Sequence, residues 1–586
     1  MHVIATAGHV DHGKSTLVRA LTGSDPDRLA EERRRGLTIT LGYCWTELPG
    51  AGEVAFVDVP GHERFIPTML SGVGPVPAVL FVVAADDGWM PQAAEHLAAL
   101  DALGVERAVV AVTRSDLADP APAAERAVAE LAGTSLHGAR VVAVSAATGH
   151  GLPELRDALA ELAGALQPPN PDSDVRLWVD RLFTVRGAGF VVTGTLAAGT
   201  IGTGDHLAVA DELVRVRGIE ALGRPRDSVA GVARIALNLG SKVPPGLRRD
   251  SVLATPDRWQ WTTVVDVVLG PDAKVPTRAD LTFHVGAVAE PVHVRPLGET
   301  HARVQLRSPV PLRIGDRAIL RDPGSRRLWG VTVVDPVPPA LGRRGSATRR
   351  ARELVDADGR LDANAEVRRR GLVSDSLLLR IGVDPTGADD VLRAGEWLMS
   401  REHAVSLRNQ LNDLVTASSA HHPLDPGITA HAAADALGLP SVEPLPLLLG
   451  GTLRTVGGRV LPAIDHGLPP KVVDAVERLV VELRKRPYQA PEAGQLRSAG
   501  LDAKSLAAAE RAGLLLRITE SIVLLPGADE AAARLLGALP QPFSTGAARR
   551  CLDSTRRVVI PLLERLDRLG LTDRLPDDTR QVRAPV

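Results

Sequence analysis

The sequence predicts a multidomain protein in which an α/β P-loop domain is followed by β-barrels and then by winged-helix modules. Residues 1 to about 166 alternate apolar strands with helices rich in alanine and leucine. Residues 174 to 340 contain short strands of period two between glycine turns, a pattern typical of barrels. After residue 345, helices followed by a brief apolar strand recur about every 60 residues. A chain of 586 residues is also too long for a single core.

A glycine-bracketed loop follows the first apolar strand, residues 3–7, and precedes a predicted helix over residues 16–21. Its glycines let successive N–H groups converge on phosphate oxygens at a helix N-terminus. Lys14 supplies a charge for the β- and γ-phosphates, and the Ser15 hydroxyl is placed to bind Mg²⁺. The residues expected to hold phosphates are Gly8, His9, Val10, Asp11, His12, Gly13, Lys14, Ser15 and Thr16.

Three further motifs follow apolar strands at the carboxyl ends, where open α/β sheets bind ligands. Asp58 can hold Mg²⁺ through water, and the Gly61 N–H can approach a γ-phosphate. Asp116 can accept two hydrogen bonds from guanine, a pair of donors that adenine lacks, although a lone aspartate is more often a helix cap. Four motifs in order favour GTP/GDP binding. The nucleotide contacts expected outside the phosphate loop are Asp58, Gly61, Thr113, Arg114, Asp116, Ser145, Ala146 and Ala147.

These motifs resemble those of the translational GTPases of the elongation factor Tu class. The resemblance implies that Thr38 contacts Mg²⁺ together with Ser15 and Asp58. It also implies that His62 orients the attacking water, with Val10 and Leu37 as an apolar gate. At the base-reading loop the family pattern is Asn-Lys-x-Asp, whereas this chain has Thr113 and Arg114. Threonine lacks the two-sided amide of asparagine, so we expect weaker nucleotide affinity with the guanine preference kept.

Composition sets the outer limits on function. The formal net charge is −2, so any nucleic-acid contact must come from local patches. The only cysteines, Cys44 and Cys551, exclude a disulfide framework and suggest a reducing compartment. No secretory leader or bilayer-spanning run is recognisable. We therefore expect a cytoplasmic protein that is a monomer.

Proline-rich links at residues 167–172 and 336–339 mark domain boundaries, and the second leads to a basic stretch at 343–352. In the family, two β-barrels follow the GTPase domain, and helices closed by a β-wing predict winged helices. The expected domains are a GTP-binding domain at 1–170, barrels at 171–257 and 258–340, and winged helices at 341–400, 401–466, 467–527 and 528–586. The links and the repeat suggest that each module folds independently.

The last module is predicted to bind RNA. A helix is expected from Thr555 to about Leu569, with Ser554 at its N-cap. Its predicted core face consists of Val559, Leu562, Leu563 and Leu566. From residue 541 onward nine arginines face six acidic residues, a local charge of +3. Arginine pairs are usually a solvated face, but the candidate RNA contacts here stand where a helix-turn-helix meets nucleic acid. They are Arg549, Arg550, Arg556 and Arg557.

The whole arrangement resembles the selenocysteine-specific branch of this family in bacteria. That branch implies delivery of selenocysteyl-tRNA to a ribosome at UGA, with the last modules holding an mRNA hairpin, the selenocysteine-insertion element. It also implies a selenocysteine pocket at Asp180, Arg181 and Arg234. A selenol is mostly ionised at neutral pH, so guanidinium groups would favour it over serine. Without the resemblance, Asp180 and Arg181 read as an ordinary ion pair.

Two rival functions remain open at this point. One is another translational GTPase, a general tRNA carrier or an initiation factor, which the terminal modules disfavour. The other is a nucleotide-sensing transcription regulator whose winged helices bind duplex DNA. GTP hydrolysis stimulated by ribosomes would favour translation, and retention on duplex DNA at physiological salt would favour the regulator.

Overall fold

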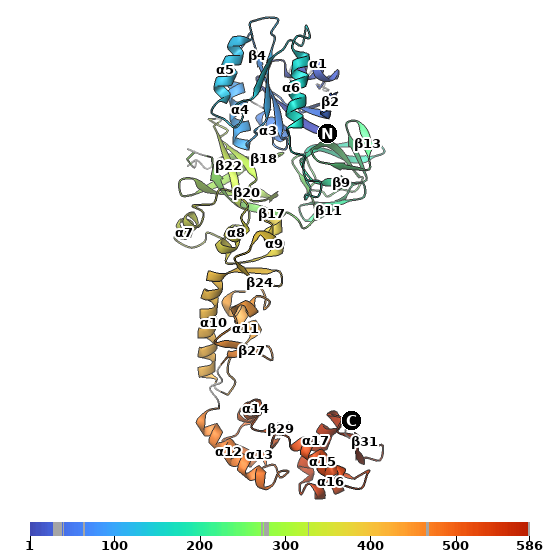
Figure 1. The fold of residues 1–586 in the computed structure, drawn as a ribbon, viewed down its shortest axis with the longest axis vertical. Helices are drawn as coiled ribbons and strands as arrows, with labels where there is room; N and C mark the ends of the chain where they lie inside the picture. Colours follow the sequence, from blue (N-terminus) through green and yellow to red (C-terminus); the bar gives the residue numbers. More distant parts are fainter. Residues whose placement is uncertain are drawn as a thin grey trace. The chain divides into compact units, whose positions relative to one another are not determined.

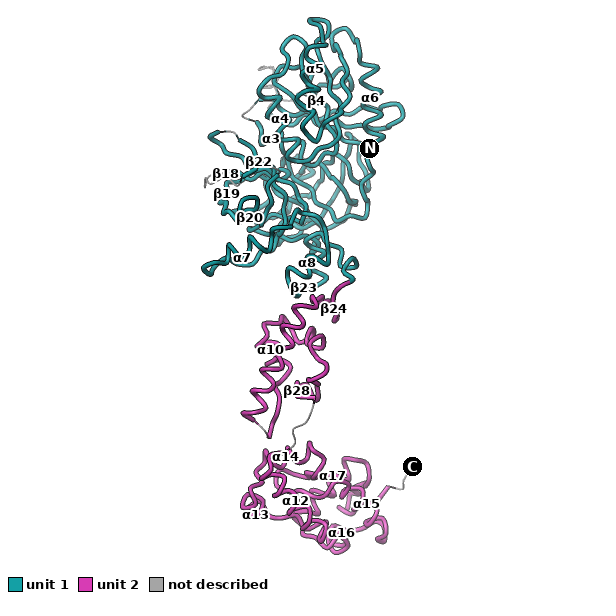
Figure 2. Tube along the Cα trace, turned by 60° about the vertical axis from the view of Figure 1, so that its left-hand side comes forward, with its two compact units in different colours: residues 1–389 teal, residues 390–586 magenta. Residues whose placement is uncertain are grey.

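The structure, a computed structural model, describes residues 1–26, 38, 40–62, 65–270, 273–274, 281–325, 327–422, 424–463 and 468–583. This part of the chain divides into two compact units, residues 1–389 and residues 390–586 (Figure 2). Each unit has its own hydrophobic cores. No helix in these ranges is both long and apolar enough to cross a membrane.

Unit 1 begins with a six-stranded sheet in the order β2-β3-β1-β4-β5-β6, covered by helices on both faces (Figure 1). Alternation along β1 explains the two faces, because Val3 and Ala5 join one core while Ile4 joins the other. The expected parallel sheet is wrong at one edge, where β2 runs antiparallel to β3. The strands are β1 (His2–Gly8), β2 (Gly42–Leu48), β3 (Gly52–Asp58), β4 (Ala78–Ala84), β5 (Ala108–Thr113) and β6 (Arg140–Ala143).

Helices cover both faces of this sheet, and the helix predicted at residues 16–21 is present as part of α1. α1 and α6 pack on the face that includes Ile4, and α3, α4 and α5 pack on the face that includes Val3. Glycines in the left-handed region end α1 and α4, at Gly23 and Gly104. The helices are α1 (Lys14–Thr22), α3 (Ile66–Val73), α4 (Pro91–Leu103), α5 (Ala121–Leu131) and α6 (Leu152–Gly164).

The first β-rich region forms an eight-stranded sheet, ordered β11-β10-β16-β7-β8-β15-β12-β13, beside the pair β14-β9. Alternating apolar residues such as Leu177 and Val179 meet in one core. Its strands are β7 (Arg176–Val185), β8 (Gly189–Leu196), β9 (Thr200–Gly202), β10 (His206–Val209), β11 (Glu212–Arg215), β12 (Gly218–Ala221), β13 (Arg224–Arg226), β14 (Ser228–Ala230), β15 (Ala233–Gly240) and β16 (Val252–Ala254).

The second β-rich region is a closed barrel, which confirms the predicted fold class. Its strand order is β17-β20-β19-β18-β21-β22, and its core includes the buried Phe283 and Val304. Closure removes exposed strand edges. The strands are β17 (Gln260–Leu269), β18 (Leu281–Val285), β19 (Val288–Leu297), β20 (His301–Leu312), β21 (Arg317–Arg321) and β22 (Leu328–Asp335).

Unit 1 ends with short elements joined to the barrel by buried ion pairs. They are α7 (Ser346–Glu353), α8 (Ala363–Arg370), β23 (Leu372–Ser374), α9 (Asp375–Arg380) and η2 (Pro385–Gly387). Asp335, only 1% exposed, accepts hydrogen bonds from Arg350, Arg369 and Arg370. Burial opposes ionisation, but these arginines lower the pKa of Asp335 to about 2.

Unit 2 repeats helices followed by small sheets. The sequence predicts brief apolar strands at 396–399, 459–462, 521–525 and 580–582, and the structure has a strand at each of these places. Its first elements are β24 (Val391–Ala394), β25 (Trp397–Ser400), α10 (Arg401–His421), β26 (Ile428–Thr429), α11 (Ala430–Leu437), η3 (Leu445–Leu448), β27 (Leu453–Val456) and β28 (Arg459–Pro462). The remaining elements are α12 (Pro470–Lys485), α13 (Ala493–Ser498), α14 (Ala503–Arg511), β29 (Leu516–Thr519), β30 (Ile522–Leu524), α15 (Ala528–Gly537), α16 (Thr545–Cys551), α17 (Arg556–Arg568), β31 (Thr572–Arg574) and β32 (Arg580–Val582).

The expectation that the last module folds independently is wrong. One continuous core joins Tyr488, Ile518 and Leu524 to the helices α15, α16 and α17. Tyr488 also donates a hydrogen bond to the Ala528 carbonyl, at 3.4 Å. The segments 468–527 and 528–583 therefore share buried apolar surface.

The predicted core face of α17 is confirmed, since Val559, Leu562, Leu563 and Leu566 are all fully buried. The predicted N-cap is wrong by one residue, because Thr555 occupies that position. The Ser554 hydroxyl instead donates to the Tyr488 carbonyl. A tertiary contact therefore competes with the local capping bond that the sequence suggested.

Candidate functional site

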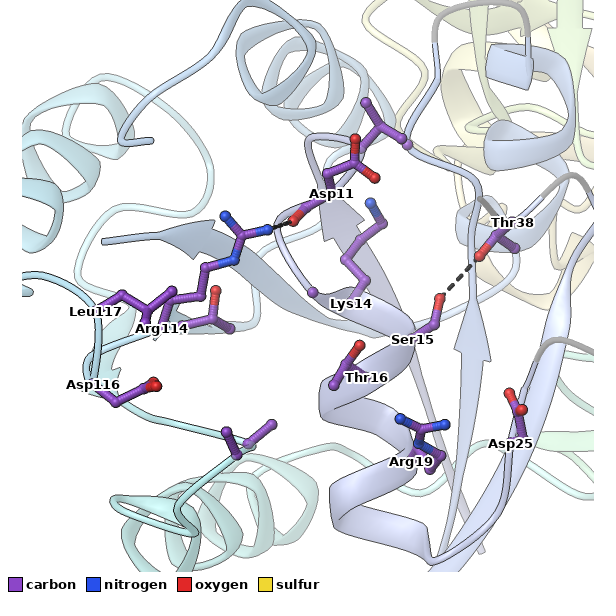
Figure 3. A pocket seen from close by; sticks show the side chains of 16 residues that line it. Asp11, Lys14, Ser15, Thr16, Arg19, Asp25, Thr38, Arg114, Asp116 and Leu117 are labelled. Carbon is purple, nitrogen blue, oxygen red and sulfur yellow. Dashed lines mark hydrogen bonds between the residues drawn. The ribbon is translucent and has the colours of Figure 1, made fainter. Parts of the chain in front are cut away.

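The predicted nucleotide residues meet in one pocket of about 660 Å³ at the carboxyl ends of the parallel strands. Figure 3 shows Asp116 and Leu117 across this pocket from Thr38. The predicted residues that line it are Val10, Asp11, Gly13, Lys14, Ser15, Thr16, Thr38, Gly61, Thr113, Arg114, Asp116, Ala146 and Ala147. Five other predicted residues do not line the pocket, namely Gly8, His9, His12, Asp58 and Ser145.

Glycine is required at two positions around the phosphate loop. At Gly8, with φ of 127°, an added Cβ would lie 2.1 Å from the Val82 carbonyl oxygen. At Gly61, a Cβ would lie 2.5 Å from the Lys14 Nζ. That Nζ donates to the Gly8 carbonyl at 3.1 Å and to the His9 carbonyl at 2.6 Å, so the ammonium stays inside the loop. The Gly61 backbone is thus close to the group expected to hold the γ-phosphate.

Three oxygen-bearing side chains converge beside the loop. The Ser15 hydroxyl donates to the Asp58 carboxylate at 2.6 Å and lies 2.9 Å from the Thr38 hydroxyl. Thr6 donates to the other Asp58 oxygen at 2.8 Å. Burial raises the pKa of Asp58, although the hydrogen bond from Ser15 and the charge of Lys14 act in the opposite direction. Hydroxyl and carboxylate oxygens suit Mg²⁺, so this donor set fits the expected ion.

His62, the candidate catalytic histidine, lies on the loop after β3. Its ring is 5.9 Å from that of Phe65, tilted at 58°. Val10 lines the pocket, and Leu37 lies outside the described residues. His62 directly follows Gly61, which lines the pocket, but His62 itself is not among the residues that line it.

The unusual base-reading loop is tied to the phosphate loop. The Thr113 hydroxyl, on a buried side chain, donates to the His12 carbonyl at 2.8 Å. Arg114 pairs with both oxygens of Asp86, at 3.1 and 2.9 Å, and donates to the Asp11 carbonyl. These bonds hold the loop in place without asparagine, and Asp116 remains on the pocket wall.

Sequence reasoning missed several residues of this site. Arg19, Asp25 and Leu117 line the pocket, and Asp86 anchors Arg114. Arg19 follows Ser15 by one helical turn, and that spacing is the signal that could have found it. Asp86 stands in the loop after β4, and its role depends on a contact with a strand end 28 residues later.

Two buried histidines, His12 and His96, accept hydrogen bonds from backbone N–H groups in and near the phosphate loop. The Gly8 N–H donates to His96 Nδ1 at 3.1 Å, and the Ala84 N–H donates to His12 Nδ1 at 3.3 Å. Burial lowers the pKa of His96 to about 3 and that of His12 to about 4, so both are neutral at pH 7. With Nδ1 accepting, His12 Nε2 carries the proton that faces Asp87 at 3.3 Å. That nitrogen is therefore unsuited to bind a metal.

A second cluster contains the predicted selenocysteine-pocket residues. Asp180, 5% exposed, is paired by Arg234 with both oxygens, and the Arg234 guanidinium lies 3.7 Å from the Tyr43 ring centroid. Burial alone would lower the pKa of the Arg234 guanidinium, but the charge of Asp180 outweighs this effect, and the pKa of Arg234 is raised. Arg181 does not pair with Asp180, because its Nη2 donates to the Leu41 carbonyl and to the Thr40 hydroxyl. The interpretation of Asp180 and Arg181 as an ordinary ion pair is therefore wrong.

A bulge explains why consecutive residues reach the same place. The register of β7 on β8 shifts between Val179 and Arg181, so Asp180 and Arg181 can face one side. The Tyr43 hydroxyl lies 3.3 Å from Asp180, and its ring lies 5.3 Å from the Arg181 guanidinium. Tyr43 stands on β2, five residues after Thr38, so the cluster adjoins the segment that carries a candidate Mg²⁺ ligand.

Some arginines of the last module form ion pairs, and others do not. Arg565, Arg574, Arg580 and Arg583 pair with Asp529, Asp578, Asp567 and Asp573 respectively. Within the described residues, the exposed arginines Arg549, Arg550 and Arg556 have no ion-pair partner. Arg557 donates to the carbonyls of Ala490 and Pro491, so it links α17 to the preceding segment.

Comparisons with known proteins match both ends of the chain. Residues 1–165 match the elongation factor Tu GTP binding domain, and residues 534–581 match the winged helix of elongation factor SelB. An elongation factor Tu of Streptomyces avermitilis is 34% identical over 280 residues, which cover 43% of this chain and 72% of that relative.

Relatives with a narrower description match about half of the chain. The selenocysteine-specific elongation factor of Escherichia coli is 39% identical over 350 residues, covering 58% of this chain and 56% of that protein. The chain spans about half the length of the curated selenocysteine-specific relatives it matches. A bacterial selenocysteine-specific elongation factor of known crystal structure has the same fold, with a TM-score of 0.80 over 100% of both chains at 24% identity.

Proposed function

Because the chain belongs to the elongation factor Tu family of translational GTPases, we propose that it delivers selenocysteyl-tRNA to the ribosome at UGA codons and hydrolyses GTP there. GTP occupies the pocket between Lys14 and Asp116, with its phosphates on the loop and its guanine on the carboxylate. Ser15 and Thr38, together with Asp58, which accepts from Ser15, would hold Mg²⁺, and the ion would neutralise charge on the β- and γ-phosphates.

His62 positions the water that attacks the γ-phosphate, giving GDP and inorganic phosphate. Phosphoryl transfer depends on positioning and on charge stabilisation more than on covalent catalysis. His62 follows Gly61, whose backbone is next to Lys14, so the ring can reach the phosphate end of the pocket. Ribosome binding completes this arrangement, as expected for a translation factor.

The observation that carries selenocysteine specificity is the arginine cluster beside Tyr43. A selenolate is an anion at neutral pH, whereas a serine hydroxyl is neutral. The hydrogen bonds of Arg181 to Leu41 and Thr40 use only Nη2, which leaves donors on Nε and Nη1 for an anion. Arg234 has its charge balanced by Asp180. Arg181 is therefore the better selenolate ligand, and Arg234 holds the pocket in shape.

The last module binds an mRNA hairpin through α16 and α17. Arg549 and Arg550 lie in the last turn of α16, and Arg556 begins α17, so three arginines with no ion-pair partner among the described residues stand at one helix-turn-helix corner. Guanidinium groups bind phosphates and base edges with paired N–H donors. The match of residues 534–581 to a winged helix of elongation factor SelB supports this assignment.

The test is purification of the GTP-bound protein from cells that make selenocysteine, followed by sequencing of the bound RNA. Enrichment of a selenocysteine tRNA, together with ribosome-stimulated GTP hydrolysis, supports the proposal. Mixed elongator tRNAs would indicate a general carrier. Retention on duplex DNA at physiological salt, without ribosome stimulation, would indicate the transcription regulator.

A further inference from the structure

The strand end that faces the base departs from the family pattern at Thr113 and Arg114. Both residues line the nucleotide pocket together with Asp116. The hydrogen-bond donors at such a strand end decide which atoms of a base are recognised. The acceptor that each donor already has therefore determines what this site can read.

The Thr113 hydroxyl is committed to the backbone around the phosphate loop. It donates to the His12 carbonyl at 2.8 Å and has the Val83 carbonyl as a second acceptor at 3.3 Å. Thr113 is only 4% exposed, and a Cβ added at Gly13 would lie 4.0 Å from its hydroxyl oxygen. Because a hydroxyl carries a single proton, Thr113 has none left for an acceptor on a bound base.

The Arg114 guanidinium is also held at the phosphate loop. Its Nη1 donates to both oxygens of Asp86, at 3.1 and 2.9 Å, and its Nη2 donates to the Asp11 carbonyl. Figure 3 shows this guanidinium beside Asp11 and away from Asp116. Ser115, the next residue, does not line the pocket. Asp116 itself carries a carboxylate, which in its ionised form only accepts hydrogen bonds.

Guanine presents both donors and acceptors to such a site. Its N1–H and 2-amino groups are donors, and one carboxylate, here that of Asp116, can accept from both. O6 and N7 are acceptors, so each is recognised only by an N–H or O–H group. Ala146 and Ala147 line the same pocket, and their backbone N–H groups can donate to O6. N7 belongs to the ring that carries the ribose, so it lies toward the phosphate loop, on the side where Thr113 and Arg114 are bonded.

We propose that this site recognises guanine through N1, the 2-amino group and O6, and that no side chain at residues 113–116 donates to N7. The inference rests on the GTP binding proposed above and narrows its chemistry. Guanine nucleotides whose position 7 is not an acceptor belong to the ligands of this site and bind as well as GTP. Thr113 sets this breadth, because Thr113→Asn would bring two amide protons, one for the His12 carbonyl and one for N7.

The test measures dissociation constants of three nucleotides for the full chain with Mg²⁺. In 7-deaza-GTP a C–H group replaces N7, and ITP lacks the 2-amino group but keeps N7. The unmodified protein should bind GTP and 7-deaza-GTP with affinities within about twofold of each other. It should bind ITP about tenfold more weakly, because ITP leaves part of the Asp116 carboxylate unpaired. Thr113→Asn should prefer GTP over 7-deaza-GTP by about three- to tenfold.

Thr113→Val is the matched control, since it keeps the shape of the side chain and removes the hydroxyl. Loss of the bond to the His12 carbonyl should weaken the binding of GTP and of 7-deaza-GTP by the same factor. A loss for GTP alone would show that the hydroxyl reads N7, and the proposal would be overturned.

The outcomes separate this inference from the function on which it rests. A preference of the unmodified protein for GTP over 7-deaza-GTP larger than about twofold would show that a donor reads N7, which overturns the inference while GTP binding stands. Equal affinity for ATP and GTP would contradict the guanine site itself. The comparison on the unmodified protein needs no variant, so a variant that failed to fold would not affect it. No arm involves tRNA, and the delivery function is decided separately.

Discussion

The arginines of the last module give a prediction that the ion-pair pattern makes quantitative. Replacing Arg549, Arg550 and Arg556 together by glutamine removes three exposed arginines at the α16–α17 corner for which no carboxylate partner is found among the described residues. Removing one arginine–phosphate interaction should lower the slope of log affinity against log salt by about 0.7 to 0.9. The triple variant should therefore lose about two to three units of slope, and at least about a hundredfold in affinity for the hairpin at low salt.

The same module provides the control. Arg574 and Arg583 are also exposed, but they pair with Asp578 and Asp573. Replacing both by glutamine removes two positive charges and leaves two carboxylates, yet should change hairpin affinity by less than about tenfold. Fluorescence anisotropy with a labelled hairpin, over a series of salt concentrations, measures both variants. Equal losses of slope in the two variants would refute the reasoning, because net charge rather than the helix-turn-helix corner would then determine binding.

Three further predictions follow from the other sites. His62→Ala should leave GTP affinity nearly unchanged and slow ribosome-stimulated hydrolysis by at least about a hundredfold in single-turnover assays; an equal loss of binding would contradict water positioning. Removing residues 528–586 should expose Tyr488 and Ile518 and lower the melting temperature of the preceding segment; calorimetry that showed equal stability would contradict the shared core. The pKa of Asp335 is below that of an unfolded aspartate, so its stabilising effect is complete above about pH 4 and is lost as pH falls toward 2; urea unfolding of Asp335→Asn should lack that part of the pH dependence.

Much of the nucleotide site was predictable because its signals are local. Glycines at 8 and 13 precede a lysine and a serine in one loop, and each further motif directly follows an apolar strand. A parallel sheet brings such strand ends to one edge, so their order along the chain is enough to place them together. The pocket confirms this convergence at Thr113, Asp116 and Ala146.

Contacts between distant segments were not predictable in the same way. Tyr43 meets Asp180 across 137 residues, and no periodicity in β2 signals that contact. Arg350 stands in a run of arginines typical of a surface, yet its side chain is buried, and the carboxylates that pair with it come from β17 and β22. Tyr488 likewise stands in a loop whose apolar partners lie mainly in α15, α16 and α17. Each of these residues is fixed by tertiary packing, which outweighs local propensity.

The most direct test of the delivery function compares two charged forms of one tRNA. Dissociation constants for selenocysteyl-tRNA and seryl-tRNA are measured with GTP, at neutral pH and at a pH low enough to protonate the selenol, for the unmodified protein and for Arg181→Ala. The arginine cluster predicts a strong preference for the selenocysteyl form at neutral pH, which shrinks at acid pH and in Arg181→Ala by about 2 to 4 kcal/mol, while seryl-tRNA binding barely changes. Equal affinity of the unmodified protein for both forms at neutral pH would contradict selenocysteine-specific delivery.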